Sequence, residues 1–187
     1  MTVEEIFAKI LAHMAKGLMI HDQISHAFGF LNLCGYQKCH EYHYFEESKN
    51  YKDLQDYYSK EFFKLLPFEN VEQPQIIPSS WFKHNSFDVD TSTKRNAVKE
   101  LTQKWIEWEK DTKKELTTYY QELYNLKEIN AMLKVAQLLK DVDNELKIAQ
   151  NKYLSLEAIG YDIISIVEEQ DNLYKKYNKK IKYLYKD

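Results

Sequence analysis

The chain has 187 residues, of which 44% are hydrophobic and 29% are charged, and its net charge at pH 7 is -3. This length suits one domain with its own core, and the composition is that of a soluble globular protein. The weakly negative charge argues against nucleic acid as the main partner. No apolar run reaches the roughly 20 residues that a membrane-spanning helix needs, so we expect no membrane segment.

The start of the chain and its cysteines favour a cytoplasmic location. The opening "MTVEEIFAKI" carries acidic residues where a secretory signal would need basic ones. The two cysteines, Cys34 and Cys39, are too few for a disulfide framework or for a zinc site of their own. We therefore expect reduced thiols in a cytoplasmic protein.

Apolar residues recur every three or four positions along most of the chain, which predicts an all-α protein. The first helix should begin after Thr2, an N-cap with Glu5 as its capping-box partner. It should end near Gly35, a residue suited to a left-handed C-cap. The helical period stops where all three prolines fall. We predict a single domain over residues 1–187, with helices over about 3–32, 37–66, 92–125, 129–156 and 159–185 and a crossover over about 67–91.

The lengths of the connections predict the topology of this domain. Short turns join antiparallel neighbours, whereas a long crossover can travel the length of a bundle before the third helix starts. The expected fold is therefore an up-down-down-up four-helix bundle with an additional long C-terminal helix. Within the crossover, "IIPSSW" is interpreted as an apolar clamp onto the bundle, and a docking loop for another protein is the alternative.

Polar residues interrupt the apolar stripes of the four bundle helices. The four interruptions are His21, Glu47, Glu109 and Asp143, and His43 lies one turn before Glu47 in "CHEYHYFEES". The stripe expected for the fourth helix runs through Leu133, Ala136, Leu139, Asp143, Leu146, Gln150 and Tyr153. Unpaired charges are costly inside a bundle, so their positions suggest a site.

Counting along the helices from the two turns places these residues at one level. From the first turn, His21 lies beside Glu47; from the second, Glu109 faces Glu145, with Asp143 within one turn. The first pair is about 13 residues from one end of the bundle, and the second is about 17 residues from the other. Together these make roughly 45 Å at 1.5 Å per residue, which is about the length of each helix.

We therefore predict a metal site in this layer, with carboxylate and imidazole ligands that suit iron, or alternatively manganese or zinc. The candidate ligands are His21, Asp22, His43, Glu47, Glu109 and Asp143. Simpler interpretations stay open: His43 and Glu47 can form an i,i+4 pair. Asp143 would face solvent if its helix were rotated by one position, and the site can also be without metal.

Five stretches distributed along the chain carry a family resemblance: "KGLMIHDQ", "CHEYHYFEES", "IPSSWF", "TKRNAVK" and "DVDNELK". With them the chain resembles the ferritin-like superfamily of ferritins, rubrerythrins and DNA-protecting mini-ferritins. It is also similar to ferritin-like proteins of Gram-positive bacteria and their prophages. The superfamily resemblance covers residues 1 to about 155. It implies a bundle that holds metal between its helices and can oxidise iron with dioxygen or peroxide.

The sequence departs from the superfamily's usual ligand pattern of one Glu from each of two helices and Glu-x-x-His from each of the other two. Glu47 is followed three residues later by Asn50 rather than by histidine. Asp143 is followed by Leu146. An atypical site is therefore expected, with His21 and His43 as substitute nitrogen ligands.

Three functions are consistent with the sequence. The leading one is a ferritin-like metal-binding protein that sequesters or oxidises iron; whether it is an enzyme stays open. The alternative is a non-enzymatic helical interaction protein of phage or mobile-element origin with a degenerate metal site. In a third, the basic "YKKYNKKIKYLYK" binds an acidic partner or nucleic acid, although a solvated helix face is the favoured interpretation. We expect a small homo-oligomer, with a dimer as the favoured state.

Overall fold

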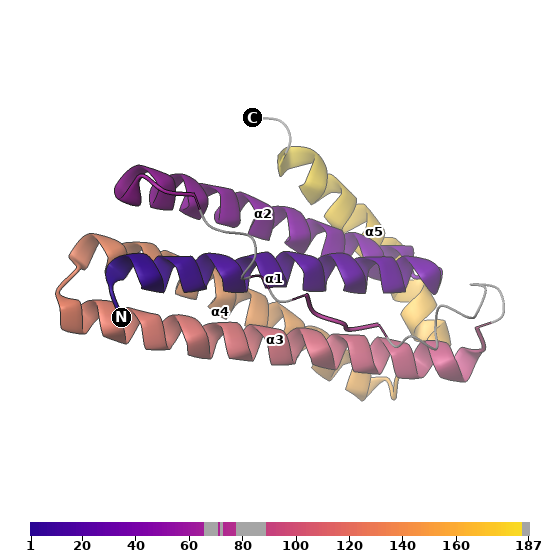
Figure 1. Ribbon diagram of the computed structural model, residues 1–187. Helices are drawn as coiled ribbons and strands as arrows, with labels where there is room; N and C mark the ends of the chain where they lie inside the picture. The colour runs from indigo at the N-terminus through magenta and orange to yellow at the C-terminus, as the bar shows by residue number, and fades with distance from the viewer. Residues whose placement is uncertain (66–70, 72, 78–88, 185–187) are drawn as a thin grey trace.

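The computed structural model describes residues 1–65, 71, 73–77 and 89–184, and this part of the chain forms five helices (Figure 1). They are α1 (Val3–Phe30), α2 (Cys34–Phe62), α3 (Thr91–Leu126), α4 (Ile129–Ala158) and α5 (Ile163–Leu184). The all-α prediction is confirmed. No helix in the described part is both long enough and apolar enough to cross a membrane.

The first four helices form an up-down-down-up bundle, as predicted. Helices α1 and α2 are antiparallel, and α3 starts at the end of the bundle opposite to the end of α2 (Figure 1). Helix α4 returns along α3, and α5 crosses the bundle obliquely against α2. The bundle therefore consists of two helical hairpins, α1–α2 and α3–α4, with α5 added on one side.

The helix ends follow local capping rules. The Thr2 hydroxyl accepts the Glu5 backbone N–H at 3.2 Å, and the Glu5 carboxylate accepts the Thr2 N–H at 2.8 Å, which completes the expected capping box. Helix α3 has Asp90 as its N-cap, and the Asp90 carboxylate accepts the Thr93 N–H at 2.7 Å.

The expected role of Gly35 is wrong. The turn between α1 and α2 places Asn32, with φ of 58°, in the left-handed region, whereas Gly35 lies in the first turn of α2. A Cβ on Gly35 would lie 2.1 Å from the Gln170 carbonyl oxygen of α5. Gly35 is therefore needed where two helix backbones approach closely.

The buried face of α4 also differs from the predicted stripe. It runs through Ala131, Val135, Leu138, Ala149 and Leu156. Leu133, which was expected to face inward, is exposed. The helix is thus rotated about its axis relative to the sequence-based expectation.

Helix α5 buries one apolar face and exposes a basic one. Ile166, Leu173, Tyr177 and Ile181 are buried. The lysines of "YKKYNKK" that are most accessible, Lys175, Lys176 and Lys179, face solvent. This arrangement agrees with an amphipathic helix.

The apolar core divides into two clusters. One contains Ile24, Phe28 and Trp105, and the other contains Phe7 and Leu116. Polar side chains lie at the boundary between the two clusters and in the adjoining part of the first one. We call this set the polar layer, and it comprises His21, His40, His43, Glu47, Glu109, Thr112 and Glu145. The core is therefore interrupted at the level where the candidate site was predicted.

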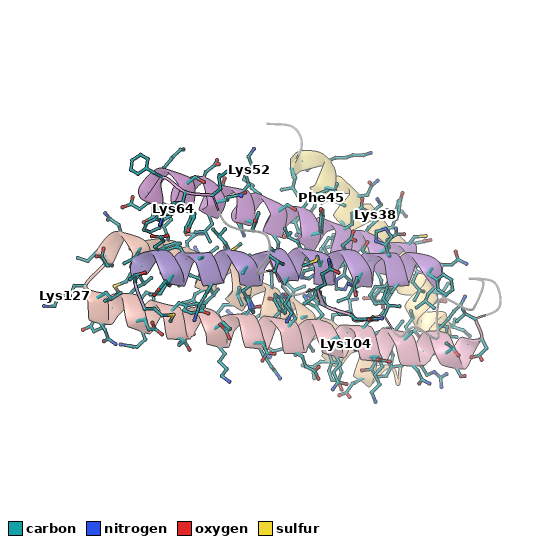
Figure 2. All side chains as sticks on the ribbon, in the orientation of Figure 1. Lys38, Phe45, Lys52, Lys64, Lys104 and Lys127 are labelled. Atoms are coloured by element: carbon teal, nitrogen blue, oxygen red, sulfur yellow. The ribbon has the colours of Figure 1, made fainter. Side chains whose placement is uncertain are left out.

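The described part of the crossover is hydrogen-bonded to both hairpins. The Gln23 side chain on α1 donates to the Pro74 carbonyl at 2.6 Å and accepts the Ile76 N–H at 2.9 Å. Lys104 on α3, labelled in Figure 2, donates to the Ile76 carbonyl at 2.9 Å. Ile76 and Ile77 pack partly buried against the core. The remainder of the expected clamp, from position 78 to 81, lies outside the described residues.

Candidate metal centre

Each bundle helix contributes one side chain to a compact group in the polar layer. These side chains are His21 of α1, Glu47 of α2, Glu109 of α3 and Glu145 of α4, and one potential ligand atom of each lies within 4.8 Å of those of the others. The His21 Nε2 atom is 3.5 Å from an oxygen of Glu47 and 3.5 Å from an oxygen of Glu109. We call this set the four-helix group.

A second group adjoins the first. His43, Glu46 and Glu145 also bring one potential ligand atom each within 4.8 Å of the others. The His43 Nδ1 atom lies 3.4 Å from Glu145 and 3.7 Å from Glu46. Since Glu145 belongs to both groups, two neighbouring cation positions can share its carboxylate.

Four of the six candidate ligands from the sequence lie in these two groups. His21, Glu47 and Glu109 belong to the four-helix group, and His43 belongs to the second.

The other two candidates, Asp22 and Asp143, lie outside both groups. The Asp22 side chain is 54% exposed and pairs with His26 on the same helix at 3.4 Å. The Asp143 side chain is 44% exposed and forms a salt bridge of 2.6 Å with Lys113. Asp22 follows a buried histidine directly, so it projects about 100° away from it around the helix. Asp143 faces outward because α4 is rotated relative to the expected stripe.

Sequence reasoning missed two members of the groups, Glu145 and Glu46. The signal for Glu145 was its position opposite Glu109 when residues are counted from the turn. Glu46, which was not among the sequence candidates, lies beside His43, and its carboxylate accepts a hydrogen bond from the Tyr42 hydroxyl.

The carboxylates of the four-helix group are held in an unfavourable environment. Burial raises the pKa values of Glu47 and Glu109 well above their usual range, and the Glu145 charge adds to the effect in both. Burial lowers the pKa of His21 to about 3, so its imidazole is neutral near pH 7. In the absence of a cation, this group cannot hold all its carboxylates ionised without strong repulsion.

The pair of His43 and Glu145 behaves differently. Burial alone would lower the pKa of His43, but its interactions with Glu145 and Cys39 together outweigh burial, and the pKa lies well above the usual value. Burial would likewise raise the pKa of Glu145, but its interactions with His43, His21 and Glu109 together lower it. A proton on His43 thus lies between the His43 ring and the Glu145 carboxylate, and a cation can take its place.

Several buried atoms of these groups have no hydrogen-bond partner among the described residues. They are the Nε2 of His21, both ring nitrogens of His43, an oxygen of Glu47 and an oxygen of Glu145. Buried polar atoms in proteins are almost always partnered, so a set of such atoms at one point requires an explanation. Their chemistry, carboxylate oxygen and imidazole nitrogen, fits Fe, Mn or Zn.

Neighbouring residues fix the carboxylates in place. The Trp105 indole donates to Glu109 at 3.1 Å. A Cβ on Gly17 would lie 2.9 Å from the Trp108 ring and 3.0 Å from Glu47, so the glycine leaves room for that carboxylate. His13 stacks on Trp108 with ring centroids 4.4 Å apart and hydrogen-bonds Thr112 at 2.8 Å.

A surface pocket of about 330 Å³ opens onto the second group between α2, α4 and α5. Glu46 and Glu145 lie in its wall, together with Tyr42, Asp141 and Lys180. Of the candidate ligands, the pocket wall therefore includes Glu46 and the shared Glu145, but not His21, His43, Glu47 or Glu109.

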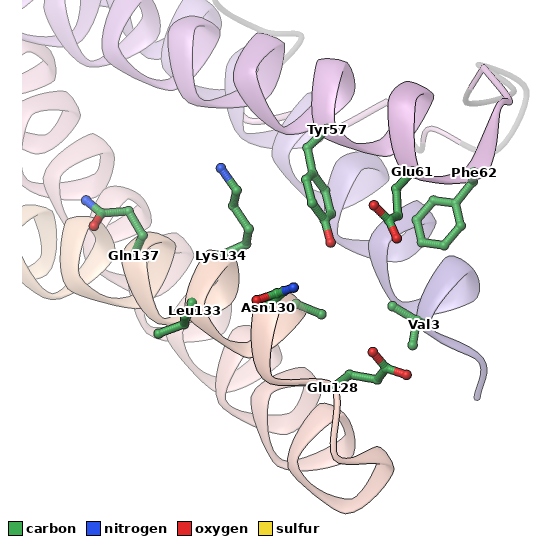
Figure 3. A pocket seen from close by; sticks show the side chains of 10 residues that line it. Val3, Tyr57, Glu61, Phe62, Glu128, Asn130, Leu133, Lys134 and Gln137 are labelled. Carbon is green, nitrogen blue, oxygen red and sulfur yellow. The ribbon is translucent and has the colours of Figure 1, made fainter.

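A larger pocket, of about 710 Å³, lies at another place in the bundle, where the start of α1, the end of α2 and the start of α4 meet (Figure 3). Tyr57, Glu61 and Phe62 line one side of it, and Leu133 and Lys134 line the other. It shares no residue with either candidate group.

Comparison with known proteins identifies the fold. No protein-family model and no curated protein sequence matches this chain. Among solved structures, the chain is similar to an open-pore ferritin of the hyperthermophilic archaeon Archaeoglobus fulgidus, with a TM-score of 0.74 and 15% sequence identity over 92% of this chain and 95% of that one. The fold is ferritin-like.

An engineered closed form of the same archaeal ferritin gives the same result, with a TM-score of 0.74, 15% identity and coverage of 92% of this chain and 94% of that one. At this identity the likeness concerns the fold of the ferritin-like bundle alone. The resemblance to proteins of Gram-positive bacteria and their prophages stays a prediction.

Proposed function

We propose that this chain is a ferritin-like metal-binding protein that holds a transition metal, iron in the first place, between its bundle helices. The observation that carries the proposal is the four-helix group, in which three carboxylates and one neutral imidazole, each from a different helix, meet with unpartnered atoms. A divalent cation would offset the repulsion among the carboxylates and supply the missing partner for His21.

The ligand atoms divide between two positions. His21, Glu47, Glu109 and Glu145 would hold a cation at the first, and His43 and Glu46 with the shared Glu145 at the second. Binding at the second position would displace the proton of His43, so metal uptake there releases a proton. Manganese and zinc are the alternative metals for the same donor set.

Oxidation of bound ferrous iron by dioxygen or peroxide is the finer part of this proposal. Iron is then the substrate, and it supplies the electron that the oxidant accepts. The carboxylates stabilise the higher charge of the ferric product, and the surrounding apolar clusters restrict access of water.

The test is the metal content of the untagged protein, measured by plasma mass spectrometry with Glu47→Ala and Glu145→Ala variants. We expect about one or two metal ions per chain, as the shared-ligand geometry allows. Glu47→Ala should lose the ion at the first position, and Glu145→Ala should lose the metal at both, each at unchanged helical circular dichroism. Asp143→Asn is the matched control, because it removes an exposed carboxylate two residues from Glu145 on the same helix and should retain the metal.

Negligible metal in the wild-type protein after anaerobic loading with Fe²⁺, Mn²⁺ and Zn²⁺ would refute the proposal. The non-enzymatic helical interaction protein would then be the better account of this chain. Metal that binds but is not oxidised by dioxygen or peroxide would refute only the finer part.

A further inference from the structure

A histidine that belongs to neither candidate group contacts His21. The contact is at the ring nitrogen of His21 that does not face the carboxylates. His40 on α2 is 2% exposed, and its Nδ1 atom lies 3.2 Å from the Nδ1 atom of His21. Two imidazole nitrogens at this distance form a hydrogen bond only if one of them carries the proton and the other offers a lone pair. The position of that proton decides whether the other ring nitrogen of His21, Nε2, has a free lone pair.

The His21 ring presents its other nitrogen to the carboxylates. Nε2 lies 3.5 Å from both Glu47 and Glu109 and has no hydrogen-bond partner in the described part of the chain. If Nδ1 carries the proton of neutral His21, Nε2 has a free lone pair that can bind a cation. If Nε2 carries it, that lone pair is lost.

We propose that His40 is a positioning residue of the metal centre: it accepts the Nδ1–H of His21 and thereby leaves the Nε2 lone pair of His21 directed at the bound cation. This role rests on the proposed metal-binding function. Metal-bound histidines are commonly oriented in this way by an acceptor on their second nitrogen, usually a carboxylate or a backbone carbonyl. Here a second imidazole takes that place.

The packing around His40 holds its ring in the required orientation. The Phe28 ring stacks on it at a centroid distance of 5.5 Å and an interplanar angle of 22°. Trp105 meets it edge-on, at 4.7 Å and 71°. The same Trp105 donates to Glu109, so one indole fixes both a ligand carboxylate and the residue that orients the ligand histidine.

A purely packing role for His40 makes different predictions. Phenylalanine would then replace it without loss, because the pocket is aromatic. The tautomer of His40 would also be irrelevant to metal binding. An acceptor role requires that the Nδ1 of His40 be unprotonated and that a side chain with an oxygen acceptor restore function.

The experiment compares His40→Phe, His40→Asn and the wild-type protein, with His26→Ala, at an exposed histidine, as control. Zn²⁺ affinity is measured by competition with a chromophoric chelator. We expect a roughly 10- to 100-fold weaker affinity for His40→Phe, the range seen when such an orienting partner is removed. His40→Asn should recover most of it because the amide oxygen can accept, and His26→Ala should match the wild type.

A second readout needs no metal. In ¹⁵N nuclear magnetic resonance spectra of the metal-free protein, we expect His40 with its proton on Nε2 and His21 with its proton on Nδ1. The proposal is overturned if His40 carries its proton on Nδ1, or if His40→Phe binds Zn²⁺ as tightly as the wild type. A wild-type protein that binds no Zn²⁺, Mn²⁺ or Fe²⁺ instead refutes the proposed function, and the role of His40 with it.

Discussion

At the scale of single residues, Gly17 determines how Glu47 reaches the four-helix group. A Cβ at this position would press on the Trp108 ring and on the Glu47 carboxylate. Gly17→Ala should therefore displace Glu47 and weaken metal binding by at least roughly tenfold, which is about 1.4 kcal/mol. Metal affinity and helical content, measured together, check this.

Gly29→Ala is the matched control in the same helix. The atoms nearest to its Cβ, at 3.0 to 3.1 Å, would belong to the end of the Gln37 side chain, which can move aside. The change should stabilise α1 by up to about 1 kcal/mol, the usual helix-propensity difference, and leave metal affinity unchanged. Equal metal affinity in both variants would show that Glu47 does not depend on Gly17.

His13 should make the metal-free protein sensitive to acid. Burial lowers its pKa below the usual 6.5, so below that pH the unfolded chain binds a proton that the folded chain resists. The contribution to stability is complete above pH 6.5 and is lost as the pH falls through the folded-state pKa. One such proton changes the unfolding free energy by at most about 1.4 kcal/mol per pH unit.

Urea unfolding of metal-free protein at pH 7.5 and pH 5.5 measures this effect. His13→Gln, which keeps a donor for Thr112, should lose less stability on acidification than the wild type does. An identical loss in both proteins would assign the acid sensitivity to other groups, such as the buried His21 and His40, whose pKa values burial also lowers.

At the scale of helices, the close contact of α5 with α2 depends on Gly35. Gly35→Ala would place a methyl group 2.1 Å from the Gln170 carbonyl oxygen. Overpacking of this kind costs typically 1–3 kcal/mol, and here it should be relieved by separation of α5 from α2. Hydrogen exchange of residues 163–184 should therefore accelerate while α1 and α3 remain protected.

Gln170→Ala combined with Gly35→Ala separates backbone from side-chain effects. Because the clash is with backbone, shortening the Gln170 side chain should not restore protection of α5. Restored protection would show that the clash with Gly35→Ala comes from the Gln170 side chain and not from its backbone.

The apolar period indicates the buried face of some helices better than that of others. Val98, Leu101, Trp105 and Leu116 recur at helical spacing on one face of α3 and are all buried, so the apolar period indicates the buried face of this helix. In α4, apolar residues occur on several faces, and Leu133 and Leu154 are exposed. The periodicity could therefore not fix the rotation of α4.

This rotation decides which carboxylate enters the site. Asp143 and Glu145 project about 200° apart around a helix, so an error of two positions exchanges an inward carboxylate for an outward one. The number of residues from the turn was the better guide to Glu145. This number sets the height of a residue along the bundle and does not depend on which residues of the helix are apolar. The sequence could not predict the role of His40. Its contact with His21 is between atoms of two different helices and depends on their exact positions.

At the scale of the whole molecule, we expect a homodimer. Exposed apolar side chains, including Phe63, Ile129 and Leu133, occur around the end of the bundle that contains the larger pocket, and such surfaces commonly mark interfaces. Analytical ultracentrifugation should give twice the 22.5 kDa chain mass. A single-chain mass or a large cage would contradict this expectation.

Leu133→Glu should shift this equilibrium toward single chains. Ile164→Glu is the matched control, because Ile164 on α5 is 66% exposed, the same as Leu133. If both variants dissociate the dimer equally, the interface includes α5. If neither does, it lies on another surface.

The distribution of the four-helix group over the chain also bears on the order of folding. His21 and Glu47 belong to one hairpin, and Glu109 and Glu145 belong to the other, across the crossover. Contacts within a hairpin are local, so we expect them to form first. Docking of the two hairpins must close the long connection, so we expect it to follow. That last step brings mutually repelling carboxylates together. A cation present at that moment would be enclosed as the two halves meet, so metallation and the completion of folding become a single event.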